Sequence, residues 1–111
     1  LPILNHVSRL HGVNVEILTS MGTHDPFQAE SAKQQKLVWL AKMNIPYRAN
    51  FVNDKQGKAK YATPRSILID DSVGCISPFN EAGGHGILHT NSSNTNRILD
   101  SVLLQLRSLD A

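Results

Sequence analysis

Two adjacent carboxylates, Asp70 and Asp71, are the strongest candidates in this sequence for a functional site. They directly follow the apolar segment 66–69, which predicts a buried strand. Adjacent carboxylates repel each other unless a cation or hydrogen-bond donors lie between them, and hard oxygen ligands suit Mg²⁺. The pair therefore indicates a Mg²⁺ site. One alternative stays open, in which the pair is a helix N-cap followed by a solvated acid.

Two hydroxyl side chains end an earlier strand pattern. Val13, Val15 and Ile17 alternate with polar residues, and the segment closes on Thr19 and Ser20. In open parallel sheets, ligands bind beyond the carboxyl ends of the strands. We therefore expect the hydroxyl groups and the acid pair to lie at the same edge of a sheet.

Helical and strand patterns alternate along the chain, and the polar segment 53–60 between two of them predicts a loop or a single helical turn. Such alternation is typical of a parallel sheet with helices on both faces, so the expected fold is α/β, a Rossmann-like three-layer α/β/α arrangement. Helices are predicted over residues 3–10, 29–43, 76–82 and 93–109, and strands over 13–20, 49–52, 66–69 and 86–88.

Length and composition restrict the functional classes. The 111 residues, 41% of them hydrophobic, predict a single domain over residues 1–111 with one core. A formal net charge of +2 without any run of Lys and Arg argues against nucleic acid as a partner. No apolar run approaches the ~20 residues of a membrane span, and Cys75 is the single cysteine. A cytoplasmic location is expected, with no membrane partner.

Histidine, cysteine and tryptophan favour structural roles. His85 and His89 would lie ~13 Å apart in a strand, too far to share one metal ion. Cys75 has no histidine at a recognisable spacing and is expected to pack in the core, and Trp39 is expected to be a core or edge aromatic.

Four stretches of sequence occur together in an order that is typical of one enzyme superfamily. They are EILTS (16–20), KLVWLAKMNIPY (36–47), KAKYATPRSILIDD (58–71) and FNEAGGHGILHT (79–90). Over roughly residues 13–90 the chain resembles the haloacid dehalogenase superfamily, and within it the deoxyribonucleotidase-like group and its phage relatives. The resemblance implies a phosphatase fold and a phosphorylated small molecule, such as a nucleotide, as substrate.

The resemblance implies a role for a hydroxyl group and a lysine. Thr19, with Ser20 beside it, matches the hydroxyl that hydrogen-bonds the phosphoryl oxygens. Lys60, ten positions before the acid pair, matches the lysine that neutralises the phosphoryl group. Lys58 and Lys55 are neighbours that compete for this assignment. If the resemblance is misleading, Lys60 is a surface lysine.

The resemblance also implies metal ligands, and it reveals a missing part. Asp70 matches the main Mg²⁺ ligand and Asp71 the supporting acid, whereas Cys75 stands where the family commonly has Asn. The motif DxDx[TV], which supplies the nucleophilic aspartate in that family, does not occur in this sequence, and no other aspartate ends an apolar strand. Gly83 and Gly84 match the turn before the last strand.

These expectations define a function and its alternatives. The leading hypothesis is a Mg²⁺-dependent phosphate-monoester hydrolase, nucleotidase-like, of which this chain is the C-terminal portion without the first motif and the cap. The alternatives are a non-catalytic binding or assembly module and one chain of a split enzyme. In the fold that the chain resembles, the missing strand is central, so the expected partners are a segment that supplies this strand or a second copy of the chain.

Overall fold

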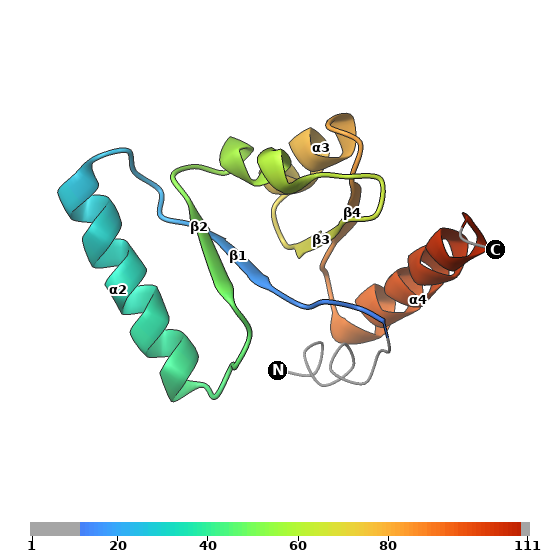
Figure 1. The fold of residues 1–111 in the computed structure, drawn as a ribbon, viewed down its shortest axis with the longest axis horizontal. Helices are drawn as coiled ribbons and strands as arrows, with labels where there is room; N and C mark the ends of the chain where they lie inside the picture. The colour runs from blue at the N-terminus through green and yellow to red at the C-terminus, as the bar shows by residue number, and fades with distance from the viewer. Residues whose placement is uncertain (1–11, 110–111) are drawn as a thin grey trace.

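The computed structural model describes residues 12–109 (Figure 1). The chain alternates between short strands and helices, as the sequence patterns predict. The helix predicted over 3–10 lies outside the described residues. The elements are β1 (Ile17–Ser20), α2 (Pro26–Lys42), β2 (Ala49–Val52), the 3₁₀-helix η1 (Gln56–Tyr61), β3 (Ile67–Asp70), α3 (Val73–Glu81), β4 (His85–Leu88) and α4 (Ser92–Leu109).

The strands form two separate parallel pairs. β1 pairs with β2, with Ile17 opposite Ala49, and β3 pairs with β4, with Ile67 opposite His85. Within residues 12–109, no strand connects β1 to β3. The α/β class with parallel strands is therefore confirmed, but the described residues do not form one continuous sheet.

Helix α2 begins three residues earlier than its apolar pattern predicts. Asp25 is the N-cap, and its Oδ1 accepts hydrogen bonds from the backbone N–H of Phe27 at 2.9 Å and of Gln28 at 3.3 Å. Pro26 follows at the first helical position, where its fixed φ suits a helix and its missing N–H costs nothing. Capping chemistry, rather than apolar periodicity, therefore sets the start of this helix.

One hydrophobic cluster lies between α4 and the strands. Ile87 of β4 is buried with Leu99 and Leu103 of α4. The cluster also includes residues from both sides of the gap between the strand pairs, namely Val13, Val15, Ile67, Ile69 and Val102. Val13 and Val15, which precede β1, therefore pack against the same residues of β4 and α4 as Ile67 and Ile69 of β3 do, although β1 and β3 are not paired.

A second cluster lies on the opposite face of β3. Leu68 packs with Cys75, Ile76 and Phe79 of α3, and Leu18 of β1 packs against the same group. Successive side chains of a strand point to opposite faces, so Leu68 faces α3 while its neighbours in β3 face α4. Cys75, 2% exposed, is a packing residue, as predicted.

Gly84 lets α3 pass closely to the start of β4. A Cβ atom at this position would lie 2.2 Å from Cε2 of Phe79, and the N–H of Gly84 donates to the carbonyl of Phe79 at 3.0 Å. Gly83 has a φ of 95°, in the left-handed region that glycine adopts readily. Both glycines have the backbone role that was predicted for them.

The outer helix α2 leaves apolar side chains in solvent. Trp39 is 49% exposed, which makes it an edge aromatic rather than a core residue. None of the helices in the described part of the chain has the length and apolar character needed to cross a membrane.

Candidate functional site

The carboxyl end of β3 carries a shielded ion pair. Nζ of Lys58 donates to Oδ2 of Asp70 at 2.6 Å, and the two side chains are only 10% and 11% exposed. The backbone N–H of Ser72 donates to the other carboxylate oxygen of Asp70 at 3.0 Å. Asp70 therefore has a donor on each oxygen, which holds the carboxylate in one orientation at the end of the strand.

Electrostatics keep Asp70 charged. Burial raises the pKa of its carboxyl group, but the hydrogen bond and charge of Lys58 and the N–H of Ser72 act more strongly together, so the pKa is lowered below the ordinary value of 3.8. Asp70 is consequently an anion at neutral pH. A shielded carboxylate that stays ionised is suited to bind a cation.

The lysine beside Asp70 is Lys58, whereas the sequence reasoning favoured Lys60. Lys60 is exposed and lines a separate pocket of about 350 Å³ together with His24 and Asp54. Both lysines lie on η1, and a 3₁₀-helix has about three residues per turn, so residues two apart point to different sides. Lys58 therefore makes the contact with Asp70, whereas Lys60, which the resemblance matches to the lysine that neutralises the phosphoryl group, lies on another side of η1.

Asp71 and Asp70 have different environments. Asp71 is exposed, and Ser72 is the N-cap residue of α3, without a side-chain capping hydrogen bond. The alternative to a Mg²⁺ site was that one aspartate is a helix N-cap and the other a solvated acid. Neither aspartate is the N-cap residue, but Asp71 is a solvated acid.

The two hydroxyl residues lie at the carboxyl end of β1, as predicted. Oγ of Ser20 donates to the carbonyl of Asn53 at 3.4 Å and accepts from the N–H of Gly22 at 3.1 Å. Thr19 is partly buried beside it and pairs with Phe51 in the ladder. Because the hydroxyl group of Ser20 already makes these hydrogen bonds, the hydroxyl group of Thr19 is the better placed of the two to bind a ligand.

The segment 53–61, which includes η1, connects the ends of the two strand pairs. Its Asn53 accepts from Ser20 at the end of β1, and Nζ of its Lys55 donates to Oγ of Ser72 after β3 at 3.2 Å. Lys58 of the same segment reaches the last residue of β3. The carboxyl ends of β1 and β3 therefore lie at the same edge of the molecule.

A histidine–aspartate pair lies at this edge, and the sequence reasoning did not single it out. Nε2 of His24 is 2.8 Å from Oδ2 of Asp54. The pKa of Asp54 is lowered, first by the hydrogen bond from the N–H of Gly57 and then by that with His24. The two residues lie 30 positions apart in loops, and their spacing matches no motif, so the sequence alone does not predict the contact.

The described residues do not form a Mg²⁺ site by themselves. Among residues 12–109, no three His, Cys, Asp or Glu side chains are grouped so that they could hold a metal ion. His85 and His89 lie apart, with His85 Nε2 at 2.9 Å from the carbonyl of Pro64 and His89 Nδ1 at 2.7 Å from Oγ1 of Thr95. Asp70 has suitable chemistry, but any Mg²⁺ it bound would need donors from elsewhere.

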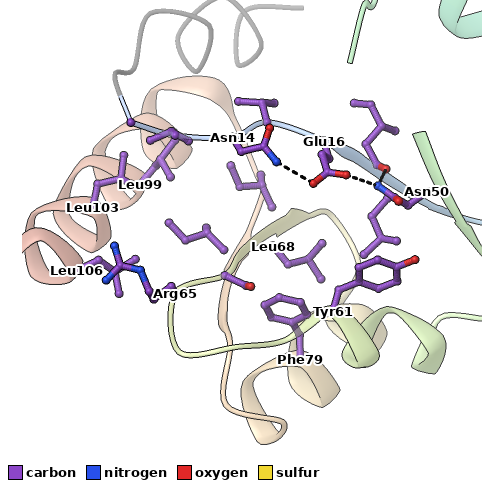
Figure 2. A pocket seen from close by; sticks show the side chains of 18 of the residues that line it. Asn14, Glu16, Asn50, Tyr61, Arg65, Leu68, Phe79, Leu99, Leu103 and Leu106 are labelled. Atoms are coloured by element: carbon purple, nitrogen blue, oxygen red, sulfur yellow. Dashed lines mark hydrogen bonds between the residues drawn. The ribbon is translucent and has the colours of Figure 1, made fainter. Parts of the chain in front are cut away.

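A larger pocket, of about 670 Å³, lies between the two strand pairs (Figure 2). One wall is the extended chain from Gly12 to Leu18, and the opposite wall is the segment 65–69. Figure 2 shows Glu16 at this pocket, where its carboxylate accepts from Nδ2 of Asn14 at 2.9 Å and from Nδ2 of Asn50 at 3.0 Å. The pocket thus occupies the gap between β1 and β3.

Comparisons of the chain with protein-family models, with curated proteins and with solved structures return no match. The functional assignment therefore depends on the geometry described above.

Proposed function

We propose that the chain is the larger part of a Mg²⁺-dependent phosphate-monoester hydrolase with a haloacid-dehalogenase-like three-layer fold. In this proposal the chain supplies the groups that bind and neutralise the phosphoryl group, and another segment supplies the nucleophilic carboxylate. The observation that carries the proposal is the shielded Lys58–Asp70 pair at the carboxyl end of β3. It lies at the same edge as the hydroxyl groups that end β1.

The chemistry of these groups suits phosphoryl transfer. A fixed ammonium group offsets the negative charge of a phosphoryl group during transfer, and hydroxyl donors orient its oxygens. Lys58 would provide the ammonium group and Thr19 the hydroxyl group, with Ser20 in a supporting place. Asp70 would hold Mg²⁺ together with donors from the additional segment, and the metal would supply further charge neutralisation.

Lys58 takes the role that the resemblance gave to Lys60. A catalytic lysine needs a fixed position, and Lys58 is held by Asp70 and shielded from solvent. Lys60 is exposed, and its pocket is lined by His24, Asp54 and the end of β2, but not by the last residues of β1 and β3. For Lys60 we therefore propose an accessory position at most.

The nucleophile must come from outside the described residues. The strands end in Ser20, Val52, Asp70 and Leu88, and Asp70 is engaged by Lys58. Covalent catalysis by an aspartate requires a free carboxylate that faces the phosphorus atom. The lack of a free carboxylate at the described strand ends also favours a second candidate function, a module that binds phosphorylated molecules without hydrolysing them.

A titration with inorganic phosphate and Mg²⁺, followed by ³¹P NMR, tests the shared part of both functions. We expect the wild-type chain to bind phosphate weakly and Lys58→Met to abolish the binding. The matched control is Lys42→Met, because Lys42 is an exposed lysine in the last turn of α2. Equal binding by all three proteins would contradict the proposal. A second assay distinguishes the enzyme from the binding module. A segment that carries a carboxylate nucleophile is added to the chain, and hydrolysis of an aryl phosphate is then measured; hydrolysis favours the enzyme.

A further inference from the structure

A pocket of about 350 Å³ lies beyond the carboxyl end of β2, where the loop between β1 and α2 meets the segment 53–61. Its walls are that loop, the last two residues of β2 and η1. In open parallel sheets, ligands bind beyond the carboxyl ends of the strands. The last residues of β1 and β3 do not line this pocket, so it is separate from the Lys58–Asp70 pair.

Hydrogen bonds between the two loops hold the walls of the pocket in place. Nδ2 of Asn53 donates to the carbonyl of Thr23 at 3.0 Å, and Nε2 of His24 is 2.8 Å from Oδ2 of Asp54. The N–H of Gly57 donates to the other carboxylate oxygen of Asp54 at 2.8 Å. A site whose walls are already ordered loses less entropy when it binds a ligand. The pocket is therefore suited to bind a small molecule without first being rearranged.

Lys60 is the cation of this pocket that is available to a ligand. Its side chain is exposed, and among residues 12–109 it forms no ion pair with a carboxylate. Both oxygens of Asp54, in contrast, are already engaged in hydrogen bonds. The pKa of Asp54 is lowered, so this carboxyl group is an anion at neutral pH and attracts Lys60. A ligand with a single negative charge therefore suits the pocket, whereas Asp54 would repel a phosphate dianion more strongly.

Two aromatic side chains supply the apolar part of the pocket. Phe51 and Tyr61 line it beside Val52, and Tyr61 is 44% exposed, so its ring is accessible to a ligand. Nζ of Lys33 lies 5.5 Å from the centre of the Phe51 ring, which is a cation–π contact. Aromatic rings in offset or edge-to-face arrangements attract one another beyond the effect of buried area. A flat aromatic ring is therefore the apolar group that fits these residues best.

We propose that this pocket binds a small aromatic carboxylate, with its ring against Phe51 and Tyr61 and its carboxylate group on Nζ of Lys60. A volume of about 350 Å³ is at the small end of the range for ligand sites, which favours a ligand with one ring. His24 and Asp54 act as a fixed wall, because their contact holds the loop before α2 against the segment that follows β2. The inference depends on this pocket, and not on the proposed phosphatase function.

The test is a titration of the full chain with benzoate, followed through the backbone amide signals in ¹⁵N NMR spectra. We expect saturable shifts at Asn53, Gly57 and Lys60, with a dissociation constant in roughly the millimolar range, because the pocket is open and the probe is small. The amide of Ser72, which follows β3, should not shift.

Two control ligands separate the contribution of the charge from that of the ring. Benzamide has nearly the same shape as benzoate without its charge, and cyclohexanecarboxylate has the charge without the flat ring. We expect each of them to bind at least roughly threefold more weakly than benzoate, which is the size of an exposed ion pair or of an aromatic contact.

Two pairs of variants identify the residues that bind. Lys60→Met should weaken benzoate binding at least roughly threefold, whereas Lys42→Met, at an exposed lysine in the last turn of α2, should leave it unchanged. Tyr61→Leu should also weaken binding, and Tyr61→Phe should preserve it, because the ring rather than the hydroxyl group makes the contact. The two lysine variants decide the outcome by themselves, since both side chains are exposed and their replacement is compatible with folding.

Equal affinity for benzoate and benzamide would overturn the proposal. So would benzoate binding that Lys60→Met leaves unchanged, amide shifts that do not saturate, or saturable shifts confined to residues outside the pocket.

Discussion

Lys58 and Asp70 form an ion pair across 2.6 Å in which each side chain is about one-tenth exposed. Such a pair has two opposing consequences. Removal of one partner leaves a poorly solvated charge, whereas removal of both charges eliminates the desolvation cost together with the attraction. The pair therefore couples two residues that lie on different elements, η1 and β3.

The first prediction concerns this coupling. We expect Lys58→Met and Asp70→Asn each to lower the free energy of unfolding by about 3 kcal/mol. The double variant should lose roughly 1–3 kcal/mol less than the sum of the two single losses, because neither charge is then left alone. Urea unfolding followed by circular dichroism measures all four proteins. Strict additivity would show that the two side chains do not interact in solution.

Lys60→Met is the matched control for that cycle. Lys60 lies on the same 3₁₀-helix but is exposed, so its replacement should change the free energy of unfolding by less than about 0.5 kcal/mol. A large loss here and none at Lys58 would reverse the assignment of the two lysines.

The second prediction concerns pH. The pKa of Asp70 is lowered below 3.8 in the folded chain, so the unfolded state binds the proton more readily. The resulting stabilisation is present above the ordinary pKa and is lost as the pH falls through the folded pKa. We expect the stability difference between wild type and Asp70→Asn to be constant above about pH 5 and to shrink below about pH 4. Asp54, whose pKa is also lowered, is present in both proteins and cancels in this difference.

The third prediction concerns activity. The chain alone should not hydrolyse an aryl phosphate in the presence of Mg²⁺, because the described strand ends supply no free carboxylate nucleophile. Mg²⁺-dependent turnover by the pure chain that Asp70→Asn abolishes would refute this expectation. In a complemented active form, Lys58→Ala should reduce kcat by at least roughly a hundredfold, and Lys60→Ala should have a small effect.

The fourth prediction concerns metal affinity. Among residues 12–109, Asp70 and Asp71 have no third acidic or histidine group beside them, and both oxygens of Asp70 already accept hydrogen bonds. We therefore expect Mg²⁺ to bind this chain in the millimolar range or more weakly. Isothermal titration calorimetry checks the affinity, with Asp70→Asn as the blank. Micromolar binding that depends on Asp70 would disprove the expectation.

The fifth prediction compares two glycines. Gly84→Ala would place a methyl group 2.2 Å from a ring carbon of Phe79, so we expect a loss of about 1–3 kcal/mol in the free energy of unfolding. Gly74→Ala is the control, because its methyl group would meet no atom closer than 3.5 Å and lies within α3. Alanine favours the helix there by roughly 0.5–1 kcal/mol. Thermal unfolding of both variants, with opposite shifts in Tm, is the expected result.

Much of the fold could be predicted because the local patterns are strong. The alternating residues before Thr19 and the apolar run before Asp70 were assigned to strands correctly, although the first strand is shorter than its pattern, beginning at Ile17. The error at the start of α2 has a local cause, since Asp25 caps the helix before the apolar periodicity begins. Asp25 followed by Pro26 is itself a helix-start signal in the sequence, and it locates the start of α2 more accurately than the apolar periodicity does.

The site was harder to predict because it depends on which side of a short helix faces inward. Lys58 and Lys60 have identical chemistry and nearly identical positions, and only the packing of η1 against α3 and β1 distinguishes them. The contact between His24 and Asp54 joins two loops that no periodic pattern connects. Tertiary packing, rather than local sequence, decides both features.

The pairing of β1 with β2 and of β3 with β4 has a consequence for folding kinetics. Each pair joins strands that are consecutive along the chain, with one helix between them: α2 between β1 and β2, and α3 between β3 and β4. Each pair closes a shorter loop than the contact of Val13 and Val15 with Ile87 does, so less chain entropy opposes it, although parallel pairing is slower than local helical contacts. The two halves can each assemble early, and their mutual docking through Leu18, Val13 and Val15 against the opposite half becomes the late step. Substitutions at these three positions should therefore accelerate unfolding while leaving the rate of folding nearly unchanged.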